Sequence, residues 1–147
     1  MWGGAGYHVD PRHRRATTAL RERGDAPWLF ERLDALFAEG GAALGLKVRP
    51  LAEPVQIVRY GAGDHFQAWH SDAGADLGDA RLVSVSVELS DGRDYRGGTL
   101  EIIPDTVGRP RTLPRGGARF FPSRAIHRVV PVTAGTRWAL VAWTGAA

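Results

Sequence analysis

The chain is 147 residues long and carries 19 lysine and arginine side chains against 16 aspartate and glutamate side chains, for a net charge of +3. This length predicts a single domain, spanning residues 1–147, with one hydrophobic core. The chain contains no cysteine, which excludes disulfide scaffolds, cysteine-ligated zinc, iron–sulfur clusters and thiol nucleophiles. Any bound metal must therefore be held by His, Asp or Glu.

Membrane and nucleic-acid partners are not expected from the sequence. No apolar run approaches the roughly 20 residues that span a bilayer, and the N-terminus lacks the basic start and apolar stretch of a signal peptide. Arginines cluster at 12–15 and 109–119, but acidic residues at 76–79 and 91–94 argue against one uniformly basic face. We therefore expect a cytoplasmic protein whose substrate is a small molecule, a peptide or a protein.

The first third of the chain is expected to be helical and the remainder rich in strands. Apolar residues recur at helical spacing over residues 27–44, with Asp25 as a plausible N-cap, Pro27 in the first turn and Gly45 as a C-cap. We thus expect helical support over about 10–46 and a β core over about 50–144. Short strands separated by turns favour a sandwich, jelly roll or barrel. They are predicted at residues 55–60, 65–70, 82–89, 99–103, 118–121, 126–132 and 137–143.

His70 and Asp72 are candidate metal ligands because they lie two residues apart in an extended segment. Side chains at i and i+2 of a strand leave the same face. An imidazole with a carboxylate suits iron, manganese or zinc better than calcium or magnesium. His65, five residues before His70, has the opposite parity and is expected to point away, as is Trp69, which we expect to pack under the helix.

A second histidine, His127, makes the pair more specific. Two histidines and one carboxylate form the facial triad of oxygen-using iron(II) enzymes, which leaves coordination positions open for a 2-oxo acid and O₂. Arg137, ten positions after His127, is suited to hold a distal carboxylate through two hydrogen bonds. If Pro131 pairs with Arg137 across a five-residue loop, His127 and Arg137 face the same side of a hairpin.

The strand at 82–89 alternates strictly, with Ser84, Ser86 and Glu88 on one face and aliphatic residues on the other. The aliphatic face is expected to pack against the helix, so the polar face should line the cavity. Glu88 then either braces Arg137 or receives a cationic or amide group of the substrate; the alternative is that this end of the strand is exposed to solvent. Val129, two residues after His127, is also expected to line the cavity.

Three stretches together resemble the prolyl-4-hydroxylase-like branch of the Fe(II)/2-oxoglutarate dioxygenases, and the resemblance covers residues 55–143. They are Gln56–Asp72 (QIVRYGAGDHFQAWHSD), Leu82–Leu89 with Tyr95–Leu100 (YRGGTL), and the tail from Phe121 to Trp143. The resemblance implies a double-stranded β-helix, which is a distorted jelly roll. It also implies Fe(II), 2-oxoglutarate and O₂ as cofactor and co-substrates. His70, Asp72 and His127 would be the iron ligands, and Arg137 with Tyr60 would bind 2-oxoglutarate.

The expected reaction is hydroxylation of an unactivated C–H bond, with release of succinate and CO₂. The family suggests a free or peptidyl amino acid, such as proline, as the substrate. Two alternatives are kept: a non-catalytic, cupin-like module that binds metal and 2-oxoglutarate, and a nucleic-acid dealkylase of the same chemistry. The dealkylase ranks lower because no second arginine follows Arg137 on the last strand. Loops 73–80 and 104–116 are expected to flank the site and select the substrate.

Overall fold

The computed structural model describes residues 10–73, 81–103 and 113–147, which contain one helix and ten strands. The helix, α1 (Pro27–Ala43), is 17 residues long. No helix in these ranges has both the length and the apolar character needed to cross a membrane. The strands are β1 (Thr17–Arg21), β2 (Val55–Tyr60), β3 (Phe66–His70), β4 (Val83–Glu88), β5 (Tyr95–Gly97), β6 (Leu100–Ile103), β7 (Ala118–Pro122), β8 (Ile126–Val129), β9 (Val132–Gly135) and β10 (Arg137–Thr144).

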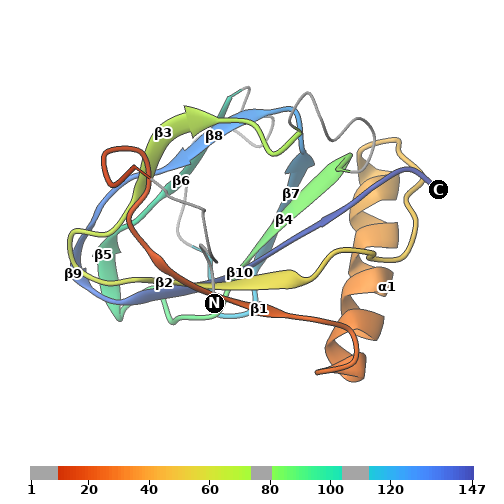
Figure 1. Ribbon diagram of the computed structural model, residues 1–147, viewed down its shortest axis with the longest axis horizontal. Coiled ribbons are helices and arrows are strands. Elements are labelled where there is room, and N and C mark those ends of the chain that lie inside the picture. The colour runs from red at the N-terminus through yellow and green to blue at the C-terminus, as the bar shows by residue number, and fades with distance from the viewer. Residues whose placement is uncertain (1–9, 74–80, 104–112) are drawn as a thin grey trace.

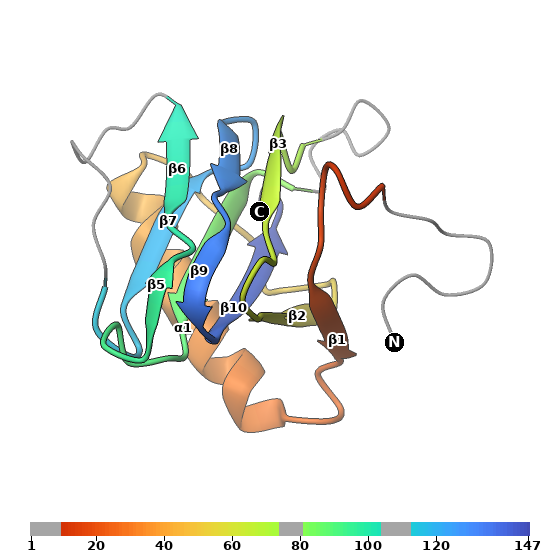
Figure 2. The same cartoon turned by 90° about the vertical axis from the view of Figure 1, so that its left-hand side faces the viewer.

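Two antiparallel sheets face each other and enclose the interior of the molecule. The larger sheet has the strand order β1-β2-β10-β4-β7, and the smaller has the order β3-β8-β6. Strands β5 and β9 form a separate two-stranded pair. Figure 1 shows β3, β8 and β6 above the larger sheet, and Figure 2 shows the same two layers from the side. This arrangement is the distorted jelly roll that the resemblance implies.

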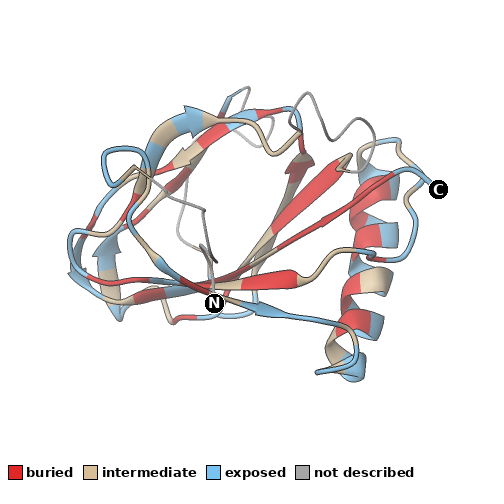
Figure 3. Ribbon diagram, in the orientation of Figure 1, coloured by how far each residue is buried: buried red, intermediate tan, exposed pale blue. Residues whose placement is uncertain are grey.

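Helix α1 packs on the outer face of the larger sheet. Its buried side chains include Phe30, Leu33 and Phe37, which cluster with Val83 and Val85 of β4. The buried stripe of α1 faces the sheet in Figure 3. Strand β4 therefore turns its aliphatic face to the helix, as the sequence predicts, and its polar side chains toward the interior.

The ends of α1 agree only in part with the prediction. The N-cap residue is Ala26, which makes no side-chain capping hydrogen bond. The prediction that Asp25 is the N-cap is therefore wrong. The Asp25 carboxylate instead accepts a hydrogen bond from the backbone N–H of Glu22 at 2.8 Å. At the other end Leu44 is the C-cap, and Gly45 follows it with φ of +73°, a conformation that glycine adopts without strain.

The expectation of helical support over residues 10–46 is also wrong in part. Residues 17–21 form β1, which pairs with β2 at the edge of the larger sheet. Just before it, the backbone of Arg15 pairs with that of His65, and the carbonyl of His13 accepts from the N–H of Ala68. Residues 13–21 therefore run from the edge of the smaller sheet to the edge of the larger one and close the gap between them.

The predicted hairpin between Pro131 and Arg137 does not form. The predicted strand 126–132 divides at residues 130 and 131, because proline has no N–H for a ladder and a fixed φ. Strand β8 pairs with β3 and β6, whereas β9 pairs with β5 across a register shift at Gly97, a glycine with positive φ. Strand β10 instead lies between β2 and β4.

Candidate active site

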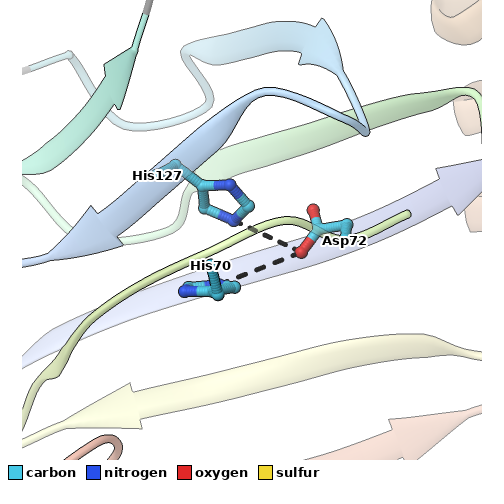
Figure 4. A group of neighbouring side chains, drawn as sticks. All are labelled: His70, Asp72 and His127. Carbon is cyan, nitrogen blue, oxygen red and sulfur yellow. Dashed lines mark ion pairs between the residues drawn. The ribbon is translucent and has the colours of Figure 1, made fainter. Parts of the chain in front are cut away.

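His70, Asp72 and His127 come together inside the jelly roll. His70 ends β3 and pairs directly with His127 of β8, so the two imidazoles are cross-strand neighbours. Asp72 follows two residues after His70, and its Oδ1 lies 3.3 Å from His127 Nε2 and 3.9 Å from His70 Nε2. One ligand atom from each of the three residues lies within 4.8 Å of the others. Figure 4 shows all three side chains directed at one another.

Hydrogen bonds around the cluster fix which atoms face its centre. The Nδ1 atom of His70 lies 2.8 Å from the carbonyl of Ala68, and that of His127 lies 3.1 Å from the carbonyl of Ala125. A proton on each Nδ1 leaves both Nε2 atoms facing the centre of the cluster, where each can bind a metal ion. The hydroxyl of Ser84, on β4, donates to Asp72 Oδ2 at 2.7 Å. Oδ1 therefore remains for the two histidines.

Asp72 and His127 stabilise each other's charged forms. Burial by itself raises the pKa of Asp72. The hydrogen bond and the charge of His127, together with the Ser84 hydroxyl, outweigh this effect, so the pKa of Asp72 lies below its usual value. Burial lowers the pKa of His127, but Asp72 outweighs this effect and the net pKa is raised. Burial and then His127 lower the pKa of His70. The two imidazole nitrogens and one carboxylate oxygen that converge here suit a divalent cation such as Fe(II).

A pocket of about 330 Å³ adjoins this cluster, within the size range of small-molecule sites. Arg137 and Tyr60, register partners on β10 and β2, both line it. Arg137 is buried, its Nε donates to Glu88 Oε2 at 3.2 Å, and its guanidinium carbon lies 5.6 Å from the centre of the Tyr60 ring. Burial raises the pKa of Tyr60 against the opposing charges of Arg14 and Arg137, so the phenol remains a proton donor.

The expected cavity-lining residues occupy different positions. Ser86 and Val129 line the 330 Å³ pocket. Ser84 is buried beneath it and holds Asp72. Glu88 lines a smaller neighbouring cavity of about 30 Å³, which shares Ser86 and Arg137 with the main pocket. Most of the two flanking loops predicted over residues 73–80 and 104–116 lies outside the described residues, namely 74–80 and 104–112.

The prediction for His65 holds, whereas the prediction for Trp69 is wrong in part. His65 is buried and bonded to the N–H of Gln67 through Nδ1, so it is a core-edge residue directed away from the cluster. Trp69 does not pack under the helix. It is 42% exposed on the outer face of the smaller sheet, where the Arg128 guanidinium lies 4.2 Å from its ring centre.

The residues that line the pocket without having been predicted from the sequence include Arg14, Phe66 and Trp143. The parity of β10 carries a signal for Trp143, because every second residue from Arg137 faces inward. Phe66 stacks on the His70 ring with centres 3.7 Å apart and planes 11° apart. Arg14 had no such signal, since it lies in a run of arginines without periodicity.

A jelly roll that encloses two histidines and one carboxylate is typical of non-haem iron oxygenases. Residues 55–145 match the family described as the 2OG-Fe(II) oxygenase superfamily. The match covers more than half of the chain, and the chain belongs to this superfamily.

Several proteins that are similar to this chain in sequence are named hydroxylases. The chain is 40% identical over 92 residues to a PKHD-type hydroxylase from Hyphomonas neptunium, a match covering 58% of this chain and 40% of that protein. It is 35% identical over 122 residues to a PKHD-type hydroxylase from Nitrobacter winogradskyi, covering 80% of this chain and 52% of that protein. The chain thus matches about half, or less, of the length of these relatives.

Solved structures share the fold. A Pseudomonas putida prolyl-4-hydroxylase superposes with a TM-score of 0.74 at 22% identity, covering 93% of this chain and 75% of that one. A Trichoplax adhaerens prolyl hydroxylase, solved with a peptide fragment of the hypoxia inducible factor oxygen degradation domain, gives a TM-score of 0.71 at 24% identity. This second match covers 96% of this chain and 67% of that one.

Proposed function

We propose that this chain is an Fe(II)- and 2-oxoglutarate-dependent hydroxylase in which His70, Asp72 and His127 hold the metal. One observation carries the proposal: the three ligand atoms converge within 4.8 Å in a pocket that is also lined by a buried arginine, Arg137. An arginine in that position suits the far carboxylate of a dicarboxylic co-substrate. Together, Fe(II), 2-oxoglutarate and O₂ supply the oxidising chemistry that hydroxylates a C–H bond and releases succinate and CO₂.

The chain's own residues orient the groups and exclude water. Ala68, Ala125 and Ser84 fix the histidines and Asp72 through hydrogen bonds before any metal arrives. Glu88 engages Nε of Arg137 and so restricts the orientation of its guanidinium. Tyr60 brings a protonated phenol to the same end of the pocket. Apolar walls limit the access of water to the site; they are formed in part by Leu100, Phe121 and Val129.

The proposed substrate is a free or peptidyl amino acid, with proline as the leading candidate. The relatives are named hydroxylases, and two structures of the same fold are named prolyl hydroxylases, one of them bound to a peptide fragment. These names favour hydroxylation over the binding-module and dealkylase alternatives.

The test is a succinate-release assay with Fe(II) and 2-oxoglutarate against free amino acids and peptides. The expected result is slow succinate release without a second substrate, and faster release with at least one of these compounds. The His127→Ala variant serves as the inactive control, and His13→Ala, which changes an exposed histidine, should behave as wild type. Binding of Fe(II) and 2-oxoglutarate without any succinate release would favour the binding module instead.

A further inference from the structure

Gln56 places a polar side chain in the wall of the active-site pocket. Side chains alternate sides along β2, and Val55 and Ile57 pack on the helix side of the larger sheet. Gln56, between them, faces the interior and lines the same pocket as the metal cluster. The residue is only 3% exposed, so its amide is removed from bulk water.

A hydrogen bond from Arg14 fixes which way this amide faces. Nη2 of Arg14 lies 2.7 Å from Oε1 of Gln56, and the guanidinium carbon lies 4.7 Å from the centre of the Phe66 ring. A guanidinium has five N–H donors and no acceptor, so the Gln56 atom that faces it must be the carbonyl oxygen. The NH₂ group is the other branch of the planar amide and is therefore directed away from Arg14.

The NH₂ group of Gln56 has two N–H donors that need acceptors. Within residues 10–73, 81–103 and 113–147, the Gln56 side chain makes one hydrogen bond, and that bond uses its oxygen. A buried donor without an acceptor costs free energy that a bound acceptor recovers. Because Gln56 lines the pocket, a molecule bound there can supply the acceptor.

The position of Gln56 along β2 separates it from the residues proposed for 2-oxoglutarate. Tyr60, the register partner of Arg137, lies four residues further along the strand, roughly 13 Å at the rise per residue of a strand. Gln56 pairs instead with Val141 of β10, which also lines the pocket. A five-carbon dicarboxylate is shorter than this separation, which favours the second substrate as the partner of the amide.

We infer that the Gln56 amide donates a hydrogen bond to the carbonyl group of the residue that is hydroxylated. This inference rests on the proposed function and narrows its substrate class. A free amino acid and a peptidyl residue have one acceptor in common, the oxygen on their own carbonyl carbon. That oxygen belongs to a carboxylate in the free amino acid and to an amide in the peptide, and an N–H group suits both.

The experiment compares compounds with and without this carbonyl group. One arm pairs a free amino acid with the analogue that lacks its carboxyl group, for example L-proline with pyrrolidine. The second arm pairs acetyl-Gly-Pro-amide with acetyl-Gly-pyrrolidide, so the two arms distinguish a free from a peptidyl substrate. Succinate release is measured with Fe(II) and 2-oxoglutarate for the wild type, Gln56→Met and Gln56→Glu.

The two variants remove the same donors in different ways. Both lack the N–H groups, whereas Gln56→Glu keeps an acceptor for Arg14, so an effect common to both belongs to the amide nitrogen. Gln67→Met is the matched control, because Gln67 is exposed and its side chain donates to the carbonyl of Arg12 outside the pocket.

Gln56→Met should raise the KM for the carbonyl compound and leave that for its analogue in place. The expected factor is about 10- to 100-fold for a carboxylate and about 2- to 10-fold for a neutral amide, the usual effects of losing one hydrogen bond. Gln56→Glu should raise this KM at least as much, because an acceptor then faces the carbonyl oxygen. Calorimetric titration of the substrate into anaerobic enzyme loaded with Fe(II) and 2-oxoglutarate should show the same loss of affinity without turnover.

Several results would overturn the inference. They are equal rises in KM for both members of a pair, a larger rise for 2-oxoglutarate than for the carbonyl compound, and a wild-type KM for the carbonyl compound in both Gln56 variants. A wild-type enzyme that no amino acid or peptide stimulates while uncoupled succinate release proceeds would also overturn it. If the wild type releases no succinate under any condition, the proposed function itself fails. Thermal unfolding identifies a variant that does not fold, and the other Gln56 variant then carries the test.

Discussion

Arg137 and Glu88 form a buried ion pair between neighbouring strands of the larger sheet, with Nε 3.2 Å from Oε2 and both side chains almost fully enclosed. Each charge is removed from water and is compensated by the other, so removal of either one leaves a costly unpaired charge. Of the two roles that the sequence left open for Glu88, this geometry favours a brace for Arg137.

Glu88→Ala should therefore raise the KM for the co-substrate in the uncoupled reaction, where no second substrate is present. It should also lower the free energy of unfolding by about 3–5 kcal/mol, the usual cost of breaking a buried pair. Glu88→Gln, which keeps an acceptor for Nε, should have the smaller effect on both. A variant impaired only when the second substrate is present would instead assign Glu88 to substrate recognition.

His127→Ala and Asp72→Ala should each lower Fe(II) affinity by more than about 100-fold. Loss of a residue that only hydrogen-bonds a metal ligand costs up to about 100-fold, and loss of a ligand should cost more. The reason is that each removes one of three convergent ligand atoms. Titration of the metal-free protein with Fe(II) under anaerobic conditions measures this directly, and His13→Ala is the matched control. Wild-type affinity in both variants would contradict the assignment of ligands.

Ser84→Ala should reduce Fe(II) affinity by about 10- to 100-fold while leaving all three ligands present. Its hydroxyl donates to Asp72 Oδ2 and so directs Oδ1 at the histidines. Ser86, two residues along the same face, lines the pocket, and Ser86→Ala is the control. Equal affinities in the two serine variants would show that Asp72 does not depend on Ser84 for its orientation.

Arg137→Ala should raise the KM for the co-substrate by the factor that corresponds to about 2–5 kcal/mol, with Fe(II) affinity largely retained. The side chain is a buried cation in the pocket. Arg128 is the control, because it lies on the outer face of the smaller sheet, bonded to Glu101 and stacked on Trp69. If Arg128→Ala raised this KM and Arg137→Ala did not, the co-substrate would be bound elsewhere.

Gly40→Ala should destabilise the metal-free protein, although alanine favours helix by roughly 1 kcal/mol over glycine. A Cβ at Gly40 would lie 2.6 Å from the Phe120 ring, and overpacking of this kind costs about 1–3 kcal/mol. Urea unfolding should therefore show a lower midpoint. Gly24→Ala, where a Cβ meets nothing within 4 Å, should show little change. A higher midpoint for Gly40→Ala would mean that α1 shifts freely on the sheet.

Short-range patterns in the sequence were sufficient for several parts of this protein. The alternation along β4 correctly assigned its aliphatic face to α1, because strand parity is a local property that burial of one face then fixes. The two-residue spacing of His70 and Asp72 likewise predicted that these two side chains lie on one side, and the structure brings them together. The strand at 55–60 was also predicted with the bounds that the structure gives.

The tertiary structure alone decided which strands are neighbours, and hence the content of the pocket. Sequence periodicity does not specify long-range pairing, so the predicted hairpin at 131–137 was replaced by insertion of β10 between β2 and β4. That pairing places Arg137 beside Tyr60 and near Glu88, from segments far apart in the chain. Likewise, Arg14 faces the pocket only because residues 13–21 close the gap between the sheets, a contact that depends on both sheets being in place.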